Sequence, residues 1–275
     1  MRLSMYTGYV QNTGFTSFDE GLRAMYKSGI RHGDIVDAEF NEIPLLRYLE
    51  HLNYAGIMPN ALVATQDIAS VYERERNRNL AAVKEYVDLL EKYKVPYLMA
   101  TPSVKEARSE EEFYVMRERL AEGFAELVDY AKGSGVKICM ENQSVSTRAD
   151  SKIDDIAYIL KNVNGLGYTL DSGNFFCVGE DAVEAYERFK DRLVYAHFKD
   201  WKYDIYGGFV RENMPRFEGC VLGNGLVPLT ELARRFKEDK KDICVTLEIN
   251  SNGITADKLT ESACFMSALF ATEEE

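Results

Sequence analysis

Short apolar runs alternate with longer stretches of helical periodicity along the whole chain. Runs that are almost continuously apolar are typical of parallel strands that helices cover on the outside. A repeated order of strand and then helix builds a parallel sheet, which is either open or closed into a barrel. We predict strands at residues 2–8, 34–39, 58–65, 95–101, 136–141, 167–171, 193–197 and 243–248.

The number and spacing of these runs favour a closed barrel over an open sheet. Eight strands in 275 residues leave about the length of one βα repeat for each strand. The chain contains no Pro-, Gly- or Ser-rich linker and no low-complexity stretch. We therefore predict an α/β protein, a single (β/α)8 TIM barrel that occupies residues 1–275.

The stretches between the predicted strands have the pattern of helices packed on a sheet. Apolar residues recur three and four positions apart, as in Leu80, Val83, Val87 and Leu90. Several stretches open on a serine that is followed three residues later by a glutamate, which is the spacing of a capping box. We predict helix starts at Ser17 with Glu20, Ser70 with Glu73, and Ser109 with Glu112.

Charge and cysteine usage exclude several classes of protein. The chain carries 33 Lys and Arg against 45 Asp and Glu, a net charge of −12. This negative charge argues against non-specific electrostatic binding to nucleic acid or to an anionic membrane. The five cysteines form no CxxC pair, and neither a membrane-length apolar run nor a signal-peptide pattern is present. We therefore expect a cytoplasmic protein with reduced thiols that binds neither nucleic acid nor membrane.

Four successive predicted strands each end on one ionisable residue, namely Glu141, Asp171, His197 and Glu248. The carboxyl ends of TIM-barrel strands meet at one mouth, where the active site lies. Three carboxylates that converge without a partner repel one another, and a divalent cation removes that repulsion. Three carboxylates and one imidazole favour one Mn²⁺ ion, with Mg²⁺, Co²⁺ or Zn²⁺ as alternatives. The other interpretation is that each acid caps a helix or pairs with a base at the mouth.

The residues around these strand ends resemble a known family. The segments LDSGN (170–174), AHFKD (196–200) and LEI (247–249), with VLGNG (221–225) before a late helix, are similar to the xylose-isomerase-like TIM barrels. This group includes sugar and sugar-phosphate isomerases and epimerases, keto-inositol dehydratases and endonucleases of abasic sites. The resemblance covers most of the chain and is strongest over residues 136–250.

The resemblance implies a role for each strand-end residue. Glu141, Asp171, His197 and Glu248 would bind one divalent metal ion. Glu141 and Glu248 would also act as the acid/base pair of an isomerase or epimerase, each on one face of a sugar or related polyol, through an ene-diolate intermediate. Dimers and tetramers are common in the family, so we expect a homodimer or homotetramer with a small-molecule sugar or polyol as its substrate.

Three positions depart from the ketose 3-epimerases of this group. Asn174 stands where the family often has a histidine, and Thr147 and Tyr203 stand in place of a glutamate and an arginine. An amide can bond a hydroxyl group but cannot exchange a proton at neutral pH. Two alternatives therefore stay open: a metal-dependent lyase or dehydratase of the keto-inositol or C-glycoside type, and a non-catalytic subunit of a complex.

Further residues near the strand ends are candidates for substrate binding. Lys199 follows His197 and would bind a phosphate or carboxylate, or stabilise an oxyanion. The connection over residues 199–228 contains the only tryptophan, and a connection of that length in a compact domain is usually functional. The predicted substrate-binding residues are Tyr6, Gln66, Asn174, Lys199, Trp201 and Arg211.

Overall fold

The computed structural model describes residues 1–271 apart from 13, 39–43, 103–106, 211–213 and 250–253. Eight parallel strands in this part of the chain close into a barrel in the order β1-β10-β7-β6-β5-β4-β3-β2. The predicted (β/α)8 TIM barrel is therefore confirmed. Its strands are β1 Arg2–Tyr6, β2 His32–Val36, β3 Met58–Ala64, β4 Tyr97–Ala100, β5 Lys137–Glu141, β6 Gly167–Asp171, β7 Leu193–Lys199 and β10 Cys244–Glu248.

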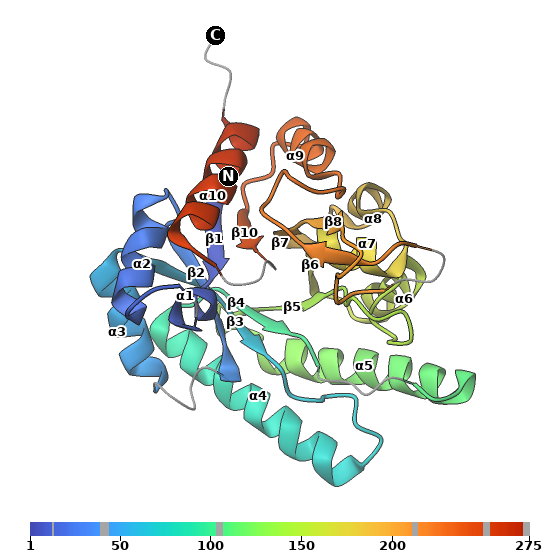
Figure 1. Ribbon diagram of the computed structural model, residues 1–275. Coiled ribbons are helices and arrows are strands. Elements are labelled where there is room, and N and C mark those ends of the chain that lie inside the picture. Colours follow the sequence, from blue (N-terminus) through green and yellow to red (C-terminus); the bar gives the residue numbers. More distant parts are fainter. Residues whose placement is uncertain (13, 39–43, 103–106, 211–213, 250–253, 272–275) are drawn as a thin grey trace.

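Helices connect the barrel strands and lie outside them (Figure 1). α10 contacts both α2 and α9, so the last helix of the chain closes the outer ring. No helix in the described residues is long and apolar enough to cross a membrane. The helices are α1 Gly8–Asn12, α2 Phe18–Lys27, α3 Leu45–Ala55, α4 Glu73–Tyr93, α5 Glu110–Tyr130, α6 Ile153–Asn162, α7 Ser172–Val178, α8 Ala182–Phe189, α9 Leu229–Glu238 and α10 Ala256–Phe270.

Two of the three predicted serine caps are confirmed. Ser17 and Ser109 are N-caps, and each side chain accepts a hydrogen bond from the backbone amide three residues on. The prediction at Ser70 is wrong, because the N-cap of α4 is Tyr72. The Ser70 hydroxyl instead accepts a hydrogen bond from the Tyr72 amide, so it stabilises the turn before the helix.

β2 differs from its predicted position. We predicted a strand over residues 34–39, but the observed strand is His32–Val36, and residue 39 lies outside the described residues. His32 and Gly33 pair with β1 on one side and with β3 on the other. Neither residue type favours strands strongly, so the local pattern does not mark them. Backbone pairing with two neighbours extends the strand toward its amino end.

The connection after β7 contains a small antiparallel sheet that the sequence pattern did not predict. β8 (Trp201–Tyr203) pairs with β9 (Phe217–Gly219). Strands of three residues are too short to show a period-two pattern. Trp201 fastens this hairpin to the barrel, because its Nε1 donates a hydrogen bond to the carbonyl oxygen of Gly173 at 3.0 Å.

The hydrophobic core has two parts. The larger part lies between the strands and the helices. The smaller part fills the barrel interior and consists of alternate strand residues, so each residue two places further along a strand also points inward. This alternation decides which side chain each strand presents at the mouth. The interior residues are Tyr6, Ala61, Val63, Met99, Cys139, Tyr195 and Cys244.

Candidate metal centre and active site

The strands that carry the predicted ligands end with side chains that point into the barrel. On β5, Cys139 lies in the barrel interior and Glu141 follows two residues later on the same face. One ligand atom each from Glu141, Asp171, His197 and Glu248 lies within 4.8 Å of the others. The structure therefore brings the four predicted ligands together at the carboxyl end of the barrel, where TIM-barrel active sites lie.

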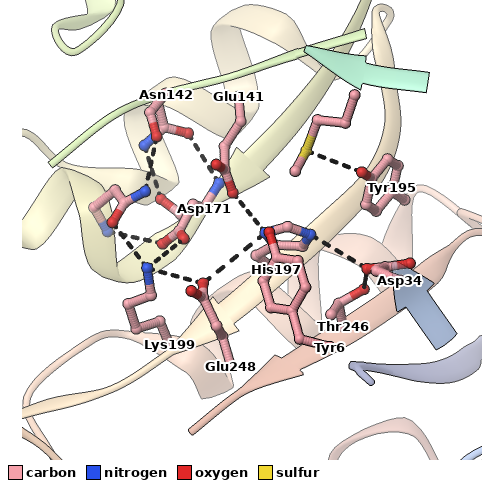
Figure 2. Close-up of polar contacts among 12 residues, drawn as sticks. Tyr6, Asp34, Glu141, Asn142, Asp171, Tyr195, His197, Lys199, Thr246 and Glu248 are labelled. Carbon is pink, nitrogen blue, oxygen red and sulfur yellow. Dashed lines mark hydrogen bonds and ion pairs between the residues drawn. The ribbon is translucent and has the colours of Figure 1, made fainter. Parts of the chain in front are cut away.

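Two cationic side chains lie among the three carboxylates (Figure 2). His197 Nδ1 is 2.5 Å from Glu141 Oε1 and 3.9 Å from Glu248 Oε2. Lys199 Nζ is 2.9 Å from Asp171 Oδ2 and 2.8 Å from Glu248 Oε2. All five residues are buried, so solvent ions screen these pairs only weakly.

Burial and charge shift the pKa values of these groups. Burial raises the pKa of Glu248 to about 8. Burial by itself lowers the pKa of His197 and of Lys199, but the neighbouring carboxylates raise the pKa of both well above their ordinary values. Burial opposes ionisation of Asp171 as well, yet the charge of Lys199 brings the pKa of that carboxyl below its ordinary value.

The carboxylate oxygens of the cluster fit a divalent cation. Glu141 Oε1, Asp171 Oδ2 and Glu248 Oε2 are buried and accept no well-directed hydrogen bond from the described residues. Their contacts are the ion pairs with His197 and Lys199. Buried anionic oxygens are costly unless cations face them, and His197 and Lys199 take that place in this structure. Together with one imidazole, these oxygens can hold a divalent metal ion.

Asn142 holds the backbone of Asp171 in place. Its Oδ1 accepts hydrogen bonds from the Asp171 amide at 2.9 Å and from the Tyr168 hydroxyl at 2.8 Å. Its Nδ2 donates to the Asp171 carbonyl oxygen at 2.9 Å. Sequence analysis did not select Asn142, although its place directly after Glu141 at a strand end was a usable signal.

A sequence model described as the xylose isomerase-like TIM barrel matches residues 11–269 of the chain. The chain belongs to this family. The resemblance seen at the strand ends is therefore confirmed over most of the chain.

Solved structures with the fold of this family cover nearly the whole chain. The zinc-bound IolI protein has a TM-score of 0.78 and 20% identity, with 98% of each chain covered. A probable 3-DHS dehydratase, AsbF from Bacillus anthracis, has a TM-score of 0.76 and 15% identity over 97% of this chain and 99% of that one. D-psicose 3-epimerase from Clostridium cellulolyticum H10 has a TM-score of 0.74 and 15% identity over 99% and 100%. None of the curated protein sequences matches significantly.

In this xylose isomerase-like barrel, three of the predicted substrate-binding residues contact the cluster. The Tyr6 hydroxyl is 3.5 Å from His197 Nδ1. Lys199 is itself a member of the cluster, and its Nζ donates to Asn174 Oδ1 at 3.0 Å. Asn174 Nδ2 donates to the Asn142 carbonyl oxygen at 2.9 Å, so the amide that stands in place of the family's histidine is fixed at both ends.

The other three predicted substrate-binding residues have different surroundings. Gln66 Nε2 donates to Asp37 Oδ2 at 2.7 Å, beyond the ends of β2 and β3. Trp201 is 1% exposed and packs edge-on against Phe209, so its ring serves the packing of the hairpin. Arg211 lies outside the described residues.

Two polar residues from the start of the chain also reach the cluster, and sequence analysis selected neither. The Tyr9 hydroxyl on α1 donates to Glu248 Oε1 at 3.1 Å. Asp34 on β2 lies with Oδ2 3.5 Å from His197 Nε2. The one available signal was Asp34 itself, an acid at the start of a predicted strand, where an apolar residue is more usual.

Proposed function

We propose that the chain is a divalent-metal-dependent isomerase or epimerase of a sugar or related polyol. The convergence of Glu141, Asp171, His197 and Glu248 within 4.8 Å at the barrel mouth is the observation that supports this most directly. These four residues would hold the ion, for which we favour Mn²⁺. A bound divalent ion stabilises the negative charge that develops on substrate oxygens when a proton leaves the neighbouring carbon.

Glu141 and Glu248 are the proposed acid and base. β6 and β7 lie between β5 and β10 in the barrel, so the two carboxyl groups approach the site from different sides. One of them removes a proton from one face of the substrate, and the other returns a proton on the opposite face. Burial raises the pKa of Glu248 to about 8, which is close to neutral pH and suits a group that gives and takes a proton. The Tyr9 hydroxyl orients it.

A lyase on the same residues is the second candidate. Removal of a proton beside a carbonyl begins both an epimerisation and the loss of a β-leaving group. The structures similar to this chain include both a D-psicose 3-epimerase and a probable 3-DHS dehydratase. The fate of the intermediate, and so the product, distinguishes the two reactions.

Elemental analysis of the purified protein tests the metal site. We expect close to one Mn, Mg, Co or Zn per wild-type chain and almost none in the double variant Glu141→Ala/His197→Ala. The double variant Glu218→Ala/His51→Ala is the matched control, since its residues pair with Lys202 and Asp19 away from the cluster. A wild-type protein that holds no metal, and shows no thermal shift with any of these ions, would contradict the proposal.

A screen of sugars and polyols with the identified metal tests the chemistry. Glu248→Gln should keep the fold and lower turnover by about 10²–10⁴-fold, the usual contribution of a positioned acid or base. A product of unchanged mass supports the isomerase or epimerase, and loss of water identifies the lyase. Turnover by the purified chain alone rules out a non-catalytic subunit. Near-wild-type turnover of Glu248→Gln would refute its acid/base role.

A further inference from the structure

Asp34 is a fully buried acid on β2, beside the candidate metal centre (Figure 2). Its Oδ1 accepts hydrogen bonds from Ser4 Oγ at 3.2 Å and from Asn60 Nδ2 at 2.7 Å. Its Oδ2 accepts one from Thr246 Oγ1 at 2.6 Å. β1, β3 and β10 each contribute one of these donors, so three neighbouring strands hold the carboxylate in one orientation.

Among the described residues, His197 is the one basic side chain that forms an ion pair with Asp34. The distance between His197 Nε2 and Asp34 Oδ2 is 3.5 Å. Nε2 is buried and forms no well-directed hydrogen bond with the described residues, so its contact is the ion pair with Asp34. The second ring nitrogen, Nδ1, is 2.5 Å from Glu141 Oε1. The two nitrogens of one imidazole are thus divided between Asp34 and the candidate metal centre.

The imidazole of His197 is held in this orientation by aromatic packing. The rings of Tyr6 and Tyr195 meet it edge-on, with centroids 5.1 Å and 5.3 Å away. His197 is 0% exposed, so the ring has no solvent-filled space in which to turn. An ionised carboxylate accepts hydrogen bonds and donates none. The hydrogen that faces Asp34 is therefore carried by Nε2. By the same rule Nδ1 carries a hydrogen toward Glu141 in this structure, and it would offer its lone pair only when a divalent ion enters the centre.

We propose that Asp34 is a positioning residue that selects the metal-binding nitrogen of His197. It keeps the proton on Nε2 and leaves the lone pair of Nδ1 for the ion, which is the carboxylate–histidine–metal arrangement found in many metal sites. Asp34 acts through His197 and not on the substrate. This inference rests on the metal site of the proposed function, and it adds a residue from β2 to that site.

The variant Asp34→Asn tests this role with little change in size. Asn60 donates to the position of Oδ1, so the asparagine oxygen takes that place and its amide nitrogen takes the place of Oδ2. An N–H group that faces Nε2 moves the His197 proton to Nδ1 and blocks the ligand. We expect the affinity for Zn²⁺ and Mn²⁺, measured by competition with a chromophoric chelator, to fall about 10–100-fold.

Asp37→Asn is the matched control. Asp37 follows β2, is 6% exposed and accepts hydrogen bonds from Thr65 and Gln66 rather than from a histidine. The same substitution three residues further along should leave the dissociation constant for both ions unchanged. Equal losses in Asp34→Asn and Asp37→Asn would overturn the assignment, because the effect would then belong to buried carboxylates in general.

A second measurement does not depend on any variant at Asp34. The chain has three histidines, so ¹⁵N NMR of the Zn²⁺-loaded wild type resolves them, and His32→Gln and His51→Gln assign the remaining signal to His197. We expect a proton on Nε2 and a zinc-bound Nδ1. Binding through Nε2 would overturn the role of Asp34. Metal binding that Asp34→Asn leaves unchanged would refute only that role, whereas a wild type that binds no metal would refute the proposed function as well.

Discussion

Lys199 lies among the candidate metal ligands, although sequence analysis selected it for an anion of the substrate. Its Nζ is 2.9 Å from Asp171 Oδ2, 2.8 Å from Glu248 Oε2 and 3.0 Å from Asn174 Oδ1. Two of the four candidate ligands are therefore bound to an ammonium group in this structure. An incoming ion would have to share these oxygens with Lys199 or displace it.

Replacing this charge should strengthen metal binding. In Lys199→Met the oxygens of Asp171 and Glu248 no longer pair with an ammonium group, and the repulsion between that group and a divalent ion is lost. We expect the dissociation constant for Mn²⁺ to fall by about tenfold or more, since charges this close interact by several kcal/mol even when well screened. Isothermal titration calorimetry measures the change.

Lys202→Met is the control for this substitution. Lys202 pairs with Glu218 at 3.2 Å on the hairpin, and its side chain is half-exposed. The substitution Lys202→Met should leave the affinity for Mn²⁺ unchanged. Weaker binding in Lys199→Met than in the wild type would show that the lysine supports the ion instead of competing with it.

The connection after β7 is organised by one carboxylate. Asp200 Oδ2 accepts hydrogen bonds from the amides of Gly223 and Gly225, and Oδ1 accepts from those of Val227 and Trp201, all at 2.9–3.1 Å. A Cβ on Gly225 would lie 2.1 Å from Asp200 Oδ1, so only glycine fits there. The segment VLGNG that resembles the family is thus a loop wrapped around Asp200.

Removing this carboxylate should destabilise the element as a whole. Asp200→Ala leaves the buried amides of Trp201 and Val227 and the part-buried amides of Gly223 and Gly225 without their acceptor. An unsatisfied buried donor costs about 1–3 kcal/mol. We expect a loss of roughly 3 kcal/mol in the free energy of unfolding, measured by urea denaturation. Asp191→Ala, at an exposed position before β7, should change it little. Equal stability of the two variants would show that water satisfies the loop amides.

Most barrel strands could be placed from sequence because an apolar run is a local property. The run that predicts β6 coincides with the observed Gly167–Asp171. β2 could not be placed well, since His32 joins it through pairing with residues on two other strands. The hairpin of β8 and β9 was not predicted for a related reason. Its three-residue strands depend on pairing with each other and on the burial of Trp201.

On the surface of the molecule, exposed apolar residues lie in the segment that joins β8 to β9. Ile205 is 77% exposed, Tyr206 is 89% exposed and Val210 is 66% exposed. Contiguous exposed apolar residues often mark an interface. They are consistent with the homodimer or homotetramer that the family resemblance implies, which stays a prediction.

Light scattering after size exclusion tests the oligomeric state. We expect a mass of two or four times the 31.3 kDa of one chain. Ile205→Ser/Tyr206→Ser should reduce it, because burial of these side chains favours association. Tyr54→Ser, at a position on α3 that is 82% exposed, should not. A wild-type mass of 31.3 kDa would contradict the prediction.

The amino-acid sequence by itself determined the order of the strands and the residue at each strand end. Both follow from local patterns: the apolar run sets the strand, and the period-two alternation sets which side chains point inward. Glu141, Asp171, His197 and Glu248 were selected because each is the ionisable residue that ends an apolar run.

Only the tertiary structure decided what surrounds these four residues. Closure of the barrel places β1 between β10 and β2, so Tyr9 reaches Glu248 and Asp34 reaches both Thr246 and His197. The first of these contacts joins residues 239 positions apart in the chain. No local period encodes a contact of that range, because it depends on how all eight strands pair around the barrel.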